Sequence, residues 1–108
     1  MNKLATIEEV WVYINSKYIF NQENYPKIPA EEPARKAFIV NHSLQHMCKS
    51  TGKIAAEVET FDHGGQMNNE NLKEATVKMF INTLKLASEL GINTWDLMNA
   101  VPDYMKSK

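Results

Sequence analysis

The chain has 108 residues, a formal net charge of −1, 44% hydrophobic residues and 23% charged residues, which predict one domain over residues 1–108. The near-neutral charge excludes a general electrostatic attraction to nucleic acid, so we expect no nucleic-acid partner. The single cysteine, Cys48, excludes an internal disulfide, and no apolar run approaches membrane-spanning length, so we expect a cytoplasmic protein without a membrane partner.

The first third of the chain, residues 1–32, predicts one helix followed by a proline-containing linker. Thr6 and Glu9 have the spacing of a capping box, in which each side chain bonds a free N–H at the start of a helix. Apolar residues recur at helical spacing after them. Residues 22–32 contain two prolines and predict an extended linker, and Pro33 suits the first turn of the next helix.

Residues 33–101 predict a core of three further helices. The first covers residues 33–61, the second covers residues 71–90 and ends at Gly91, and a short last helix ends at Pro102. The helix over residues 71–90 is apolar around nearly its whole circumference, which is typical of a bundle centre or a subunit interface. The sequence therefore predicts an all-α bundle of about four helices that is completed by homo-oligomerisation.

The helix over residues 33–61 has two opposite faces. One face carries His42, His46, Lys49 and Lys53, at steps of four, three and four residues. Such a stripe can bind an anion, hold a metal or simply face water. The opposite face is an apolar stripe of Ala37, Val40, Leu44, Met47, Cys48, Thr51, Ala55 and Val58.

A metal site is one interpretation of the stripe, because His42 and His46 have the spacing of two ligands on one helix. A third ligand is missing, since Cys48 points to the apolar side and Lys49 and Lys53 repel a cation. An oxygen-ligand site would need carboxylates that do not converge on one helix face: Glu57, Glu59, Asp62 and Glu74. We therefore assign no metal and no cofactor.

An anion site is the interpretation that we favour. Lys78, in the polar stripe of the helix over residues 71–90, faces the basic stripe if the two helices pack antiparallel. Ammonium groups that converge repel each other unless an anion or acidic partners such as Glu57 and Glu74 neutralise them. We predict a phosphate- or nucleotide-binding site, with no catalytic residue assigned, formed by His42, His46, Lys49, Lys53 and Lys78.

Two segments carry a family resemblance, KSTGKIAAEVE and LKEATVKMFINTLKLASELGINTWDLMNAV. They resemble the MazG-like nucleotide pyrophosphohydrolases, an all-α superfamily that hydrolyses nucleoside triphosphates to a monophosphate and pyrophosphate. The first segment is similar to the family's E-E-x-G-E-L-A-E, and the second to its D-E-L-A-D-V-L and L-A-x-x-L-G-I-D. The resemblance covers residues 42–101 and implies a MazG-like bundle with a pocket between helices.

The family's acidic metal ligands have no acidic counterparts in this chain. Alignment on Gly52 places the family's E-x-x-E pair on Ser50 and Lys53, and the second segment places its E-x-x-D pair on Ala75 and Lys78. Magnesium binds those carboxylates and bridges to substrate phosphates. With these four residues in their place, we expect magnesium-dependent hydrolysis to fail and lysines to neutralise phosphate directly.

The sequence leaves three functions open. The first is binding of a nucleotide or another phosphate-bearing ligand without the magnesium-dependent reaction. The second is a non-catalytic helical interaction module, in which the basic stripe is solvated or lies at an interface. The third is a divergent phosphohydrolase that uses His42 or His46 as its acid or base.

Overall fold

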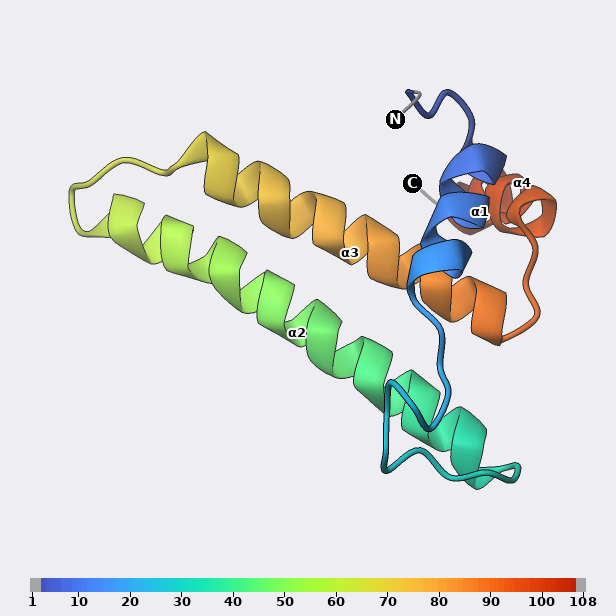
Figure 1. Ribbon diagram of the computed structural model, residues 1–108. Helices are drawn as coiled ribbons and strands as arrows, with labels where there is room; N and C mark the ends of the chain where they lie inside the picture. Colours follow the sequence, from blue (N-terminus) through green and yellow to red (C-terminus); the bar gives the residue numbers. More distant parts are fainter. Residues whose placement is uncertain (1–2, 107–108) are drawn as a thin grey trace.

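Four α-helices and no strand make up the described part of the chain, residues 3–106, in a computed structural model. They are α1 (Ile7–Lys17), α2 (Ala34–Asp62), α3 (Asn69–Glu89) and α4 (Thr94–Met105), which confirms the predicted all-α class. The helices α2 and α3 form a long antiparallel hairpin, and α1 and α4 lie at one end of it (Figure 1). Among residues 3–106, no helix combines the length and apolarity that a membrane crossing needs.

The helix ends follow from local signals in the sequence. Thr6 Oγ1 accepts a hydrogen bond of 3.1 Å from the Glu9 backbone N–H, which is one half of the predicted capping box. The Glu9 carboxylate accepts from the Thr6 hydroxyl at 3.0 Å instead of from a backbone N–H. The Asn93 side chain caps α4 by accepting from the Asp96 backbone N–H. Gly64 and Gly91 follow α2 and α3 with φ angles of 92° and 76°. This left-handed conformation is open to glycine at little steric cost, so both helices stop there.

One predicted helix end is wrong. Pro102 does not end the last helix, because α4 continues to Met105. Proline at this position removes the N–H that would bond to the Met98 carbonyl. Both residues are exposed, so water can satisfy that carbonyl and the helix continues for its final turn.

The linker between α1 and α2 is folded onto the start of α2. Its residues Phe20 and Ile28 are buried together with Ile39 of α2, and Tyr25 and Phe38 pack against this cluster. The predicted linker is therefore not simply extended, because it turns twice to place these side chains against the helix. The cluster fixes the linker beside the first turns of α2.

A buried polar contact joins α1 to α3. Lys85 is only 7% exposed, and its Nζ donates to Asn15 Oδ1 at 3.0 Å and pairs with Glu89 Oε2 at 3.2 Å. The Ser88 hydroxyl donates to the same Asn15 oxygen at 3.0 Å, and the ammonium lies 5.6 Å from the centroid of the Phe20 ring. A buried charge needs such partners, so the contact holds α1 and the linker against α3.

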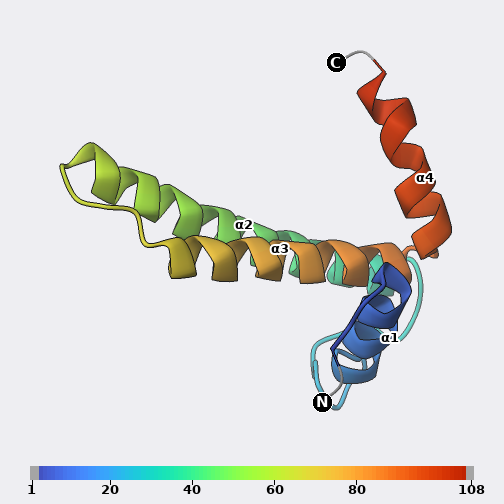
Figure 2. The ribbon, with the colours of Figure 1, turned by 90° about the horizontal axis from the view of Figure 1, so that it is seen from above.

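The apolar stripe of α2 is not buried by the chain itself. Leu44 and Val58 are exposed, whereas the buried side chains of the middle of α2 are those of Ser43 and Ser50. The hairpin thus packs through small side chains and leaves larger apolar ones at its surface. The helices α1 and α4 lie at the end of the hairpin away from the loop between α2 and α3. There they point away from the hairpin on opposite sides, so neither runs along this surface (Figure 2).

Replacement of Leu84 in α3 tests whether this residue belongs to the core. It is 1% exposed, and replacement by alanine should lower the free energy of unfolding by about 2–5 kcal/mol through lost burial and a residual cavity. Urea unfolding at a fixed protein concentration measures the loss. Val12→Ala, at an exposed position of α1, is the matched control and should change stability by about 0.5 kcal/mol or less. Equal losses in the two variants would contradict the assigned core.

Candidate functional site

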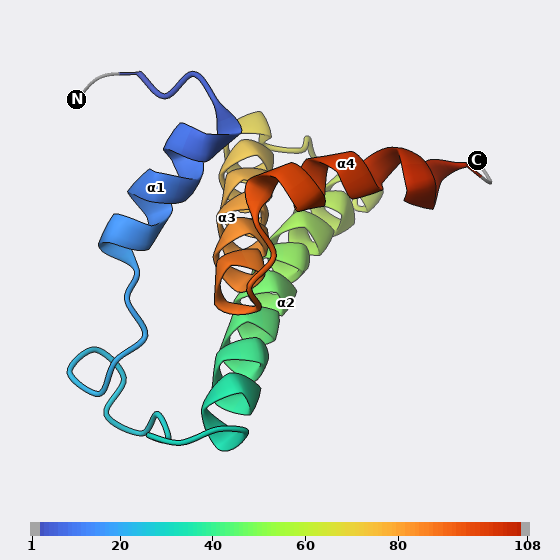
Figure 3. The ribbon, with the colours of Figure 1, turned by 90° about the vertical axis from the view of Figure 1, so that its right-hand side faces the viewer.

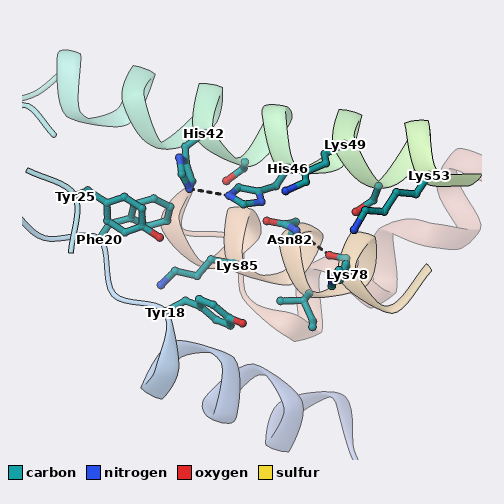
Figure 4. A pocket seen from close by; sticks show the side chains of 13 residues that line it. Tyr18, Phe20, Tyr25, His42, His46, Lys49, Lys53, Lys78, Asn82 and Lys85 are labelled. Atoms are coloured by element: carbon teal, nitrogen blue, oxygen red, sulfur yellow. Dashed lines mark hydrogen bonds between the residues drawn. The ribbon is translucent and has the colours of Figure 1, made fainter. Parts of the chain in front are cut away.

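A pocket of about 290 Å³ lies between α2 and α3, beside the linker (Figure 4). All five residues predicted for the anion site line it: His42, His46, Lys49, Lys53 and Lys78. The antiparallel packing of the hairpin brings Lys78 to face the α2 stripe. The side chains of the stripe thus border a concave space, and those of His46, Lys49 and Lys53 are also exposed to water.

The four positions at which the resemblance predicts carboxylates, Ser50, Lys53, Ala75 and Lys78, lie in one region. Ser50 and Lys53 of α2 line the pocket together with Lys78 of α3. Ala75, one turn before Lys78, is completely buried. Two of the four positions thus present ammonium groups to the pocket, and none of the four presents a carboxylate.

Sequence reasoning missed the pocket residues that come from the linker and from the end of α3. Phe20 and Tyr25 close one end of the pocket, and Lys85 reaches it from α3 (Figure 4). No local pattern links these residues to the α2 stripe, since only the fold of the linker brings them there. The other lining residues outside the prediction are Tyr18, Ser43, Ser50, Ile81 and Asn82.

His42 belongs to an aromatic cluster at this end of the pocket. Its ring is stacked on that of Phe38 at 6.1 Å and meets the rings of Tyr25 and Phe20 edge-on at 4.9 Å and 5.7 Å between centroids. Partial burial, and then the nearby His46, lower the pKa of His42 below its usual 6.5. The two Nε2 atoms lie 3.0 Å apart, so one ring donates a hydrogen bond and the other accepts it.

The other end of the pocket is cationic. Lys78 Nζ lies 2.7 Å from Glu74 Oε1, and this hydrogen-bonded pair raises the pKa of Lys78 and lowers the pKa of Glu74. The charge of Lys53 lowers the pKa of Glu74 further. Within the described chain, Lys49 and Lys53 have no carboxylate oxygen within the 4.0 Å of an ion pair. Lys49 and Lys53 thus lack an ion pair, although Lys53 is attracted to Glu74 over a longer distance.

Glu57, predicted as a possible partner of the lysines, has a different role. Its carboxylate accepts a hydrogen bond of 2.6 Å from the Asn68 backbone N–H and one of 2.9 Å from Asn71 Nδ2. These bonds lower the pKa of Glu57. The residue thus ties the loop at the tip of the hairpin to α2, and Glu74 alone of the two predicted partners contacts a pocket lysine.

No group of three or more His, Cys, Asp or Glu side chains suited to hold a metal ion occurs within residues 3–106. His42 and His46 are the two pocket-lining side chains of the kinds that commonly bind metal ions. The pocket-lining residues nearest to them along α2 are Ser43 and Lys49. A metal site usually needs three or four protein ligands. The residues present thus suit an anion better than a metal ion.

Comparison of the chain with protein-family models, with curated proteins and with solved structures finds no match. The resemblance to the MazG-like pyrophosphohydrolases therefore stays a prediction from the sequence. The function has to be argued from the pocket itself.

The lowered pKa of His42 predicts how stability depends on pH. The unfolded chain takes up a proton on this residue at a higher pH than the folded chain, so stability is retained above about pH 6.5 and falls as the pH drops through and below it. His42→Gln should reduce this loss, measured as the slope of the unfolding free energy against pH. His63→Gln is the control, because that side chain is 78% exposed at the far end of α2. A slope that His42→Gln leaves unchanged would contradict the prediction.

Proposed function

We propose that this pocket binds a small molecule that carries phosphate. The observation that carries the proposal is the convergence of ammonium groups from two helices on one cavity: Lys49, Lys53, Lys78 and Lys85. Two of these charges have carboxylate partners, since Glu74 pairs with Lys78 and Glu89 with Lys85. The other two, Lys49 and Lys53, have no ion-pair partner, so both are available to an anion that enters the pocket.

The two ends of the pocket suit two parts of one ligand. The lysine end offers charge-assisted hydrogen bonds to phosphate oxygens. The opposite end offers the ring faces and edges of Phe20, Tyr25 and His42 to a planar or apolar group. A nucleotide has both parts, and the pocket volume of about 290 Å³ lies just below the usual range for ligand sites, about 300–1,000 Å³.

Binding without magnesium is part of this proposal. The family resemblance implies carboxylates that hold magnesium, and the metal then bridges to phosphate. In this chain Lys53 and Lys78 stand at two of those four positions and border the pocket. An ammonium group donates to a phosphate oxygen directly, so the protein supplies the positive charge that a metal would otherwise bring.

Replacement of both Lys53 and Lys78 by glutamine should abolish this binding. Each lysine removed takes away a hydrogen bond to a charged group, which contributes about 1.5–3 kcal/mol and therefore at least about tenfold in affinity. Calorimetric titration with a nucleoside triphosphate and with pyrophosphate, each in the presence and absence of magnesium, measures the loss.

The double variant Lys36→Gln with Lys73→Gln is the matched control for this titration, because both lysines are exposed and lie outside the pocket. It removes the same two positive charges from the chain and should leave the affinity unchanged. Equal loss in the control would mean that net charge alone attracts the ligand. Binding that requires magnesium would contradict the direct contact between lysine and phosphate.

A non-catalytic interaction module is the second candidate function, and a separate observation favours it. Large apolar side chains of α4 are exposed, among them Trp95, Met98, Val101 and Tyr104. The helix projects away from the hairpin (Figure 3). In this function α4 docks on a partner, and the pocket lysines face water. Absence of any heat of binding with both phosphate compounds would favour this candidate over the first.

Hydrolysis with histidine as the acid or base is the third candidate, and it draws on the contact of 3.0 Å between His42 and His46. A neutral imidazole near physiological pH accepts a proton readily. Phosphorus NMR of the titrated samples measures turnover. Release of phosphate or pyrophosphate that is lost in His46→Ala would support hydrolysis, and intact ligand in every sample would support binding alone.

A further inference from the structure

The hairpin of α2 and α3 has a second broad surface, on the side away from the pocket. Each helical residue turns the chain by about 100°, so the apolar stripe of α2 points about half a turn away from His46 and Lys53. On α3, Thr76, Phe80 and Thr83 likewise point about half a turn away from Lys78, which lines the pocket. We call this surface the back face, and define it by Leu44, Thr51 and Val58 of α2 and Thr76, Phe80 and Thr83 of α3.

The back face is uncharged and exposed. All six of its defining residues are exposed, although three of them are large hydrophobic residues, Leu44, Val58 and Phe80. The face opposite to it carries the lysines and histidines of the pocket. A helix normally turns its apolar side toward another packed layer, and within residues 3–106 no layer covers this one.

The threonine hydroxyls of the back face already have hydrogen-bond partners, so these side chains can be buried at little cost. The hydroxyl of Thr51 donates to the Met47 carbonyl at 2.9 Å, and those of Thr76 and Thr83 donate to the carbonyls four residues before them at 2.7 Å and 2.9 Å. Their hydrogen-bonding needs are thus met within their own helices, and their methyl groups remain to pack outward. Such a surface can lose its water without leaving a polar group unpaired.

The chain also exposes more surface than its size requires. Its accessible surface is 8219 Å², whereas a compact monomer of 12.4 kDa exposes about 6,100 Å². Its radius of gyration is 16.5 Å, against about 13 Å for a compact chain of this length. The excess of roughly 2,000 Å² is more than the roughly 800 Å² per partner that a standard protein interface buries.

We infer that the back face packs on the back face of a second copy of this chain. Two hairpins placed face to face make a four-helix bundle, which gives each apolar stripe the second layer that it lacks. The six defining residues carry no charge, so no like charges meet at the centre of a two-fold contact, in which the same patch of both copies meets. The pocket stays open in this arrangement, since it lies on the other side of the hairpin. The inference therefore does not depend on the proposed ligand.

The placement of α4 also favours a second copy of the chain as the partner. The helix α1 lies on the pocket side, where Asn15 contacts Lys85, and α4 leaves the hairpin on the opposite side (Figure 2). It consequently borders the back face. Its exposed Trp95, Met98 and Val101 recur every three residues, so one side of α4 is available to the flank of the second copy.

Sedimentation equilibrium of the full chain at micromolar concentration tests the inference. The expected mass is about 25 kDa, twice the 12.4 kDa of one chain. Leu44→Asp places a charge in the back face and should return the mass to 12.4 kDa with unchanged helical circular dichroism. Val12→Asp, at an exposed position of α1, is the control and should keep the doubled mass. A wild-type mass of one chain overturns the inference, whether or not another protein binds this face.

A thiol probe keeps the test decisive if Leu44→Asp does not fold. Thr51→Cys in a Cys48→Ala background places the only thiol at the middle of the back face. Its reaction with a thiol reagent should slow as the protein concentration rises, because dimerisation covers it. A doubled mass at high concentration, with the same rate as at dilutions where the mass is that of one chain, would place the contact on another surface and overturn the inference.

Discussion

The small side chains between α2 and α3 are the constraint on which the rest of the molecule depends. Ser43, Ser50 and Ala75 are almost completely buried in the hairpin, at positions where larger residues would separate the helices. Small side chains at these three positions allow the two helices to lie close together. The lysines and histidines of the pocket lie on one broad side of the hairpin, and the exposed apolar residues of the back face lie on the other.

The cationic side is completed by elements distant in the sequence. The buried ammonium of Lys85 needs acceptors, and Asn15 of α1 and Glu89 of α3 provide them. The hydrogen bond from Lys85 to Asn15 holds α1 against α3. The linker that follows α1 then brings Phe20 and Tyr25 to the pocket. The same interaction thus anchors the N-terminal third of the chain and gives the pocket its aromatic end.

The sequence was sufficient for features that depend on local chemistry. Capping signals such as Thr6 predicted where helices begin, and the spacing from His42 to Lys53 predicted which side chains share a face. It was insufficient where distant segments meet, so no pattern in the sequence indicated that Lys85 is buried. Nor does an apolar stripe indicate whether its own chain covers it, because burial within a chain and burial between chains produce the same periodicity.

The two hydrogen bonds that Glu57 accepts at the tip of the hairpin have a consequence for the order of folding. By joining α2 to the loop and the start of α3, it fixes their register through residues at most 14 apart in the sequence. The contact of Asn15 with Lys85, in contrast, closes a separation of 70 residues. Local contacts form with less loss of chain entropy than distant ones. The hairpin is therefore the part of the chain that assembles first and opens last, and the pocket is complete only once α1 and the linker have joined it.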